Sequence, residues 1–171
     1  MNSEGLLVDT DVSSYVAWQR PKGKAFIPIL RDRLLAVSFA TVGELYFGAV
    51  KAGWGDQKIR SLETILKRYT VIPGTYAVAR AYGDIKAAFR EQVDECDMWI
   101  AATALVHQLP VVTNNLRHFE PMRDRFAFGL LHPERTLPAN TMCPSKSGHW
   151  AAASGGSKYN TPIGRPCRRG V

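Results

Sequence analysis

Short apolar runs, each followed closely by a polar side chain, are the feature that most constrains the fold of this chain. Asp9 follows the run Leu6–Val8, and Asn115 follows the run 111–113. Runs of this kind are typical of strands that are buried on both faces of a parallel sheet. A carboxylate so close to buried residues must be paired, protonated or bound to a metal ion. The pattern therefore predicts polar groups at the ends of buried strands, where they can converge on one site.

Between these runs the sequence has helical periodicity. The expected strands are 6–9, 34–38, 69–72, 111–113 and 126–131. The expected helices are 11–19, capped by Asp11 or Ser13, then 25–32, 41–52, 56–67, 75–92 and 97–108, with a loop over 21–24. This alternation predicts an α/β fold of three layers, in which a short, mostly parallel sheet has helices on both faces.

Length and composition narrow the class of protein. The 171 residues favour one domain with a substantial core. No apolar run is long enough for a membrane span, and the N-terminus does not resemble a signal peptide, so we expect a cytoplasmic protein without a membrane partner. Cys96, Cys143 and Cys167 have no paired spacing and predict neither a disulfide framework nor a zinc site.

The formal charge of +7 is concentrated near the C-terminus. All fifteen acids lie at or before Glu134 together with sixteen Lys and Arg residues, so residues 1–134 carry a net charge of only about +1. Residues 135–171 are basic and rich in Gly, Ser and Pro. We therefore expect one domain over 1–134 and a disordered or loosely attached tail over 135–171. The tail either binds RNA through its charge or is dispensable.

Each acid near a strand has a structural alternative. Asp9 fits a turn or helix cap, and Glu44 fits the last position of a capping box that starts at Thr41. Asp97 fits a helix cap or a first-turn acid favoured by the helix dipole. However, Asp97 shares its helix face with small apolar residues at offsets three, four and seven, which predicts a carboxylate at the inner rim of the sheet.

Two further polar residues follow the last apolar run. Asn115 fits a cap of the next segment, although its amide can also hold a water molecule or a phosphate oxygen. His118 stands beside Phe119, and for a lone histidine a surface or packing role is favoured over proton transfer.

Four segments together resemble the PIN-domain ribonucleases, and in particular the VapC-type toxins. The matching segments are Leu6-Leu7-Val8-Asp9-Thr10-Asp11-Val12, Ser38-Phe39-Ala40-Thr41-Val42-Gly43-Glu44-Leu45, Asp97-Met98-Trp99-Ile100-Ala101-Ala102 and Val111-Val112-Thr113-Asn114-Asn115-Leu116-Arg117-His118-Phe119. They occur in the order expected for the family, and the segment that begins at Asp97 is the most specific.

This resemblance implies a three-layer α/β/α PIN-like domain that hydrolyses RNA with Mg²⁺ or Mn²⁺. It implies that Asp9, Glu44 and Asp97 hold the metal ion, with Asn115 at a position that is often a fourth acid. It also implies a homodimer, and a cognate antitoxin protein that occupies the active-site groove and silences the toxin.

The sequence departs from the family pattern in its distribution of carboxylates. Asp11 stands where the family usually has Asn, whereas Asn115 removes an acid, so a second metal ion would bind weakly. Thr10 and Thr113 lie beside the proposed ligands and are secondary candidates. The candidate contacts to RNA phosphates are Lys22, Lys24 and Arg117.

In the mechanism that these residues predict, Asp9 and Asp97 bind the metal directly, and Glu44 completes the metal shell or orients the attacking water. Asn115 positions the substrate or a metal-bound water. One alternative is a phosphatase of the haloacid-dehalogenase type, with Asp9 as nucleophile and Asp11 as general acid. The other is a non-catalytic module that binds RNA or protein.

Overall fold

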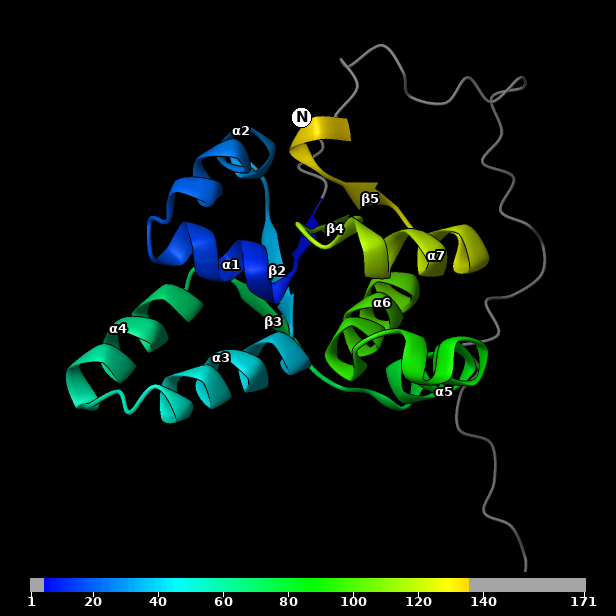
Figure 1. Ribbon diagram of the computed structural model, residues 1–171, viewed down its shortest axis with the longest axis horizontal. Coiled ribbons are helices and arrows are strands. Elements are labelled where there is room, and N and C mark those ends of the chain that lie inside the picture. Colours follow the sequence, from blue (N-terminus) through cyan, green and yellow to red (C-terminus); the bar gives the residue numbers. More distant parts are fainter. Residues whose placement is uncertain (1–4, 136–171) are drawn as a thin grey trace, which may run out of the picture.

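A five-stranded sheet forms the centre of the molecule in the computed structural model, which describes residues 5–135 (Figure 1). The strands are β1 (Leu6–Val8), β2 (Leu35–Ser38), β3 (Thr70–Ile72), β4 (Val111–Val112) and β5 (Leu130–Leu131). Their order is β3-β2-β1-β4-β5, and every pairing is parallel. The predicted parallel sheet is confirmed, and the predictions for the tail beyond Arg135, including Cys143 and Cys167, lie outside the described residues.

Seven α-helices and three short 3-10 helices surround the sheet in the described part of the chain. They are α1 (Thr10–Ala17), η1 (Pro21–Ala25), α2 (Ile27–Leu30), α3 (Phe39–Lys51), α4 (Asp56–Leu66), α5 (Tyr76–Phe89), η2 (Arg90–Gln92), α6 (Glu95–His107), α7 (Leu116–Phe126) and η3 (Pro133–Arg135). Figure 1 shows α5, α6 and α7 gathered on one side of the sheet and α1 and α2 on the other, with α3 and α4 forming an arm. None of these helices is long and apolar enough to cross a membrane.

Alternating side chains divide the core between the two faces of the sheet. Leu7 and Val111 pack in the cluster that includes residues of α5, α6 and α7, whereas Leu6 and Val112 pack with residues of α1 and α2. All four are at most 2% exposed, and burying an apolar side chain of this size contributes about 2 kcal/mol. The three-layer prediction is therefore confirmed by packing on both faces.

Several predicted boundaries are wrong, each because a different polar residue caps the helix. The first helix is capped by Asp9, not by Asp11 or Ser13, and α3 is capped by Ser38. Because α3 begins at Phe39, Glu44 lies in its second turn and not in its first.

Other corrections concern the segments outside the central strands. The predicted loop 21–24 is the 3-10 helix η1, and the helix predicted to begin at Asp97 begins at Glu95 after the cap residue Asp94. The strand predicted over 126–131 is only β5, because α7 continues to Phe126 and is capped by Ala127, whose backbone is left-handed.

The sheet order fixes where a site can form. The chain passes from β1 to β2 and β3 on one side, and later to β4 and β5 on the other side of β1. In open α/β sheets, ligands bind beyond the carboxyl ends of the strands where the order reverses in this way. Here that point lies between β1 and β4, at the residues that follow Val8 and Val112.

Candidate active site

Asp9 lies at this reversal point and is only 3% exposed. It follows β1 with an extended backbone and caps α1, so its Oδ1 atom accepts a hydrogen bond of 2.6 Å from the backbone N–H of Thr10. Its Oδ2 atom accepts a hydrogen bond of 2.6 Å from Thr113 Oγ1. Burial raises the pKa of Asp9 to about 7 against the lowering effect of the Thr113 hydrogen bond, and the negative charges of Asp97 and Asp11 raise it further.

Asp97 lies in the first turn of α6 and is 9% exposed. Its Oδ2 atom is 2.6 Å from His118 Nδ1 and accepts a hydrogen bond of 3.1 Å from Asn115 Nδ2. Burial raises the pKa of Asp97 to about 6, although the hydrogen bond and the charge of His118 act in the opposite direction. The predicted position at the inner rim of the sheet agrees with this burial.

The end of β4 connects the two acids through Thr113 and Asn115. Thr113 Oγ1 donates to Asp9 and accepts a hydrogen bond of 2.9 Å from the backbone N–H of Asn115. Asn115 occupies the cap position of α7, but its side chain makes no capping hydrogen bond. The capping alternative for this side chain is therefore wrong, because its amide group is directed at Asp97 instead.

His118 is the residue whose role the sequence did not reveal. The sequence favours a surface or packing role for His118, but its Nδ1 atom lies 2.6 Å from Asp97 Oδ2 and the side chain is only 29% exposed. One signal was available, because residues three apart share a helix face and His118 therefore had to lie beside Asn115. Nothing in the sequence indicated that Asp97, on another helix, faces the same pair.

Glu44 reaches the site from α3 and is half-buried. Its Oε2 atom accepts a hydrogen bond from Thr10 Oγ1, which also lies 3.3 Å from Thr41 Oγ1. The capping-box alternative for Glu44 is wrong, because Ser38 Oγ accepts the N-terminal hydrogen bond of α3 at 3.3 Å from the backbone N–H of Ala40. Thr10, the residue directly after Asp9, thus links the Glu44 carboxylate to the start of α1.

The Glu44 carboxylate also lies close to two residues that the sequence did not single out as ligands. Within residues 5–135, one group of three Asp, Glu, His or Cys residues has its ligand atoms within 4.8 Å of one another, and it consists of Glu44, Asp94 and Cys96. Asp9 and Asp97 are not members of this group. Burial, with the charge of Glu44, raises the pKa of the Cys96 thiol to about 12, so the thiol is neutral.

The other candidate residues lie around this centre. Asp11 is exposed in the first turn of α1. The pKa of Tyr15 is raised mainly by burial, and the charge of Asp11 raises it further. Lys22 Nζ lies 5.8 Å from the centre of the Tyr15 ring. Lys24 and Arg117 are exposed, on η1 and on the first turn of α7.

The donor set suits a hard divalent cation. Asp9, Asp97 and Glu44 offer carboxylate oxygens, which Mg²⁺ and Mn²⁺ prefer as ligands. Asp9 and Asp97 are both buried, and the charge of Asp97 contributes to the raised pKa of Asp9. A cation between these groups would remove that repulsion, so the residues present fit such an ion.

Comparison with known proteins relates the chain to a defined group. A family model described as PIN domain matches residues 6–123. Ribonuclease VapC2 of Haemophilus influenzae is 35% identical over 117 residues, which cover 67% of this chain and 89% of that protein. The tRNA(fMet)-specific endonuclease VapC of Shigella flexneri is 28% identical over 117 residues, with the same coverage of 67% and 89%. The solved structure of VapBC-1 from nontypeable Haemophilus influenzae has a TM-score of 0.63 and 25% identity, covering 77% of this chain and 99% of that chain.

Proposed function

This chain belongs to the PIN-domain family, among its VapC-type ribonucleases, and from that premise we propose that it is an endoribonuclease that acts as the toxin of a VapBC-type pair. The observation that carries the proposal is the pair of buried carboxylates, Asp9 and Asp97, at the reversal point of a parallel sheet. The family match speaks against the phosphatase alternative, in which Asp11 would be the general acid.

The proposed reaction is metal-dependent hydrolysis of an RNA phosphodiester. Asp9, Asp97 and Glu44 would hold Mg²⁺ or Mn²⁺, which when bound lowers the pKa of a water molecule and stabilises the charge that develops on the phosphate. Thr113 and the N–H of Thr10 orient Asp9, and the hydroxyl of Thr10 orients Glu44. Glu44, which is less buried than the two Asp residues, would complete the metal shell or orient the attacking water.

The proposed substrate is RNA, as the names of the related ribonucleases suggest. Lys22 is supported as a phosphate contact because its ammonium group lies over the ring of Tyr15 on α1, the helix that Asp9 caps. The position of Lys22 near this face of α1 therefore brings positive charge toward the acids. Lys24 and Arg117 remain candidates on the strength of their exposure alone.

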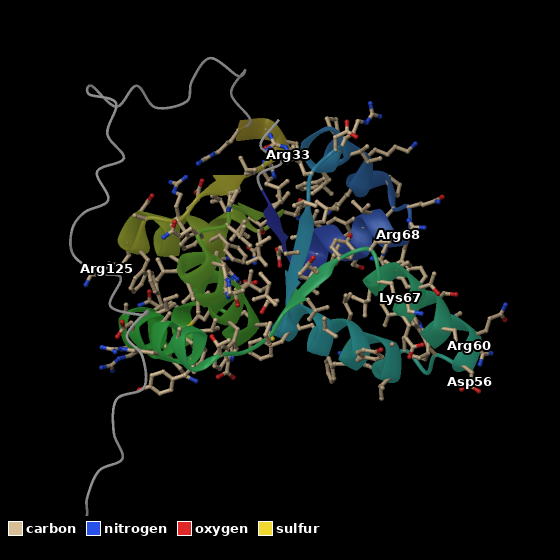
Figure 2. All side chains as sticks on the ribbon, turned by 180° about the vertical axis from the view of Figure 1, so that it is seen from behind. Arg33, Asp56, Arg60, Lys67, Arg68 and Arg125 are labelled. Carbon is tan, nitrogen blue, oxygen red and sulfur yellow. The ribbon has the colours of Figure 1, made fainter. Side chains whose placement is uncertain are left out.

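The proposed protein partner is an antitoxin, because the solved relative is a VapBC complex. The arm formed by α3 and α4 offers a suitable surface, since Phe47 and Val50 on α3 are 67% and 75% exposed. Figure 2 shows Arg60 on α4 and Lys67 and Arg68 just beyond its C-terminal end, and all three are exposed. Such a surface would bind a segment with apolar and acidic side chains. A homodimer is proposed from the family resemblance only.

Cleavage of a mixed RNA pool tests the proposal. The protein, freed of any co-purifying partner, is incubated with Mg²⁺, with Mn²⁺ and with EDTA. The site variant is Asp97→Asn, and the matched control is Asp124→Asn, which changes an exposed acid on α7. We expect discrete cleavage with metal, in the wild type and the control only. Cleavage in EDTA would contradict the metal dependence, and absence of cleavage from the folded wild type would favour the binding-module alternative.

A further inference from the structure

We propose that His118 and Asn115 act together as positioning residues, which hold Asp97 by its Oδ2 atom and thereby leave Oδ1 as the oxygen available to a divalent cation. This inference rests on the proposed function, because it concerns how one of the proposed metal ligands is oriented. Neither the resemblance nor the family match assigns a role to His118.

The contacts of the Asp97 carboxylate are strongly asymmetric. Oδ2 is 2.6 Å from His118 Nδ1 and 3.1 Å from Asn115 Nδ2. Both of these side-chain contacts of Asp97 are made by Oδ2. Both nitrogen atoms come from the start of α7, whereas Asp97 lies at the start of α6, and these two helices pack against each other. The packing of α6 on α7 therefore determines which oxygen of Asp97 is held.

The distances from His118 to Asp97 and Asn115 indicate which nitrogen of the imidazole carries a proton. When Asp97 is ionised, its oxygen at 2.6 Å from Nδ1 calls for a proton on Nδ1, because a bare nitrogen would face the oxygen with a second lone pair. Asn115 Nδ2 is also a donor and lies 2.8 Å from Nδ1, but a protonated Nδ1 cannot accept from it, so in this tautomer the amide donates to Oδ2 alone. Two N–H groups thus converge on Oδ2 and occupy its two lone pairs, so that rotation of the carboxylate is opposed from both sides.

The same arrangement explains the amide at position 115. An aspartate there would place a second carboxylate about 3 Å from Asp97 and would compete for the proton of His118. The amide of Asn115 donates to Asp97 and adds no charge. We therefore assign the departure from the family pattern to a change in how Asp97 is held, with Asn115 as its second donor.

Substitutions of His118 test the position of the hydrogen-bond donor separately from the size of the side chain. An Asn side chain can place its NH₂ group near the position of Nδ1, whereas a Gln side chain places its NH₂ group near Nε2. His118→Asn should thus keep the contact with Asp97, and His118→Gln and His118→Leu should lose it. His107→Leu is the matched control, because His107 is exposed at the end of α6.

The measurements are Mn²⁺ affinity, followed by the electron paramagnetic resonance of free Mn²⁺, and the thermal unfolding temperature in EDTA. We expect His118→Gln and His118→Leu to weaken Mn²⁺ binding about tenfold or more, as for other groups that orient metal ligands. His118→Asn and His107→Leu should bind as the wild type does, within about threefold. Unfolding temperatures should not follow this order. Equal affinity in the Asn and Gln variants would overturn the proposal.

A second readout uses the metal-free protein. The ¹⁵N spectrum of the imidazole, assigned by comparison with His118→Asn, should show the proton on Nδ1 of His118. A proton on Nε2 with a bare Nδ1 would overturn the proposal, as would a wild type that does not bind Mn²⁺. If the wild type binds Mn²⁺ with the expected order of variants but cleaves no RNA, the proposed function fails and the positioning role stands.

Discussion

Single side chains at the site oppose folding when no cation is bound. Asp9 and Asp97 are buried acids, and burial is the main cause of the raised pKa of each. A buried carboxylate with a raised pKa is more easily protonated in the folded protein than in the unfolded chain. The stability of the metal-free protein should therefore depend on the pH through these two acids.

We predict that metal-free protein becomes less stable as the pH rises from about 4 to about 7. The pKa of Asp9 is about 7 in the folded protein and near 3.8 in the unfolded chain. In this window Asp9 therefore keeps its proton in the folded protein but has released it in the unfolded chain. The free energy of unfolding should fall by about 2–4 kcal/mol from this group. Urea denaturation in EDTA at both ends of the window measures it. Asp9→Asn should make the pH dependence shallower and leave the part that Asp97 contributes, whereas Asp124→Asn should not change it. Equal slopes for the wild type and Asp9→Asn would contradict the prediction.

The sequence predicted the acids of the site better than their partners. Asp9 and Asp97 could be singled out because each adjoins an apolar segment, which is a local property. The contact between His118 and Asp97 joins two helices, so it depends on the packing of α6 on α7. Similarly, the bond from Thr113 to Asp9 depends on β1 pairing with β4, which no local pattern indicates.

At the level of elements, the 3-10 helix η1 approaches α1 so closely that only glycine fits between them. A Cβ atom on Gly23 would lie 2.7 Å from the backbone oxygen of Tyr15, whereas a Cβ atom on Gly83, inside α5, would meet no atom within 4 Å. This contact holds η1, with Lys22 and Lys24, against the helix that follows Asp9.

We predict opposite effects for alanine at these two glycines. Gly23→Ala should destabilise the protein by about 1–3 kcal/mol, because a backbone atom must move. Gly83→Ala should stabilise it by up to about 1 kcal/mol, because alanine favours the helix interior. Chemical denaturation measures both values. A Gly23→Ala variant with unchanged stability would show that η1 can shift away from α1 with little loss of unfolding free energy.

The start of α3 depends on a buried pair of hydroxyl groups. Ser38 Oγ accepts the capping hydrogen bond of α3 and lies 3.2 Å from Thr103 Oγ1 on α6. Both residues are fully buried. The sequence placed the cap at Thr41 because a capping-box pattern begins there, but β2 passes directly into α3 at Ser38. The start of α3 is therefore set by the point at which β2 ends, and hydrophobic periodicity does not indicate that point.

We predict that Ser38→Ala destabilises the protein by about 1–2 kcal/mol, since it removes a cap and a buried partner. Ser61→Ala is the control, because Ser61 is exposed and its hydroxyl donates only to the backbone oxygen of Gln57 within α4. The shift of the denaturation midpoint measures both. A Ser38→Ala midpoint equal to that of the control would show that Thr103 compensates for the loss.

At the scale of the whole molecule, the parallel sheet could be predicted but the strand order could not. Alternating strands and helices indicate parallel pairing, because each strand must be followed by a crossover. Many strand orders satisfy that pattern. The observed order places β1 between β2 and β4, which joins segments separated by about a hundred residues and creates the reversal point.

The division of the chain into a domain and a tail, which the sequence predicts, can be tested by RNA binding. A chain that ends after Arg135 loses Lys146, Lys158, Arg165, Arg168 and Arg169. We expect its unfolding temperature to be unchanged. We expect the dependence of RNA affinity on salt to become shallower, by about 0.7 in the log–log slope for each lost phosphate contact.

Binding is measured in the Asp97→Asn background, which avoids cleavage. An unchanged slope would favour a tail that is dispensable for RNA binding. A large fall in the unfolding temperature would instead show that the domain boundary lies further along the chain.

The position of the site in chain order has a consequence for synthesis. Asp9 and His118 are more than a hundred residues apart, so at about 5–20 residues per second roughly 5–20 s separate their translation. During that interval the nascent chain carries β1 but lacks the strand that pairs with it on its other side, and it lacks both donors to Asp97. If Asp97 is held as proposed, ribonuclease activity awaits the synthesis of α7, and the nascent chain stays inactive until that helix has been made.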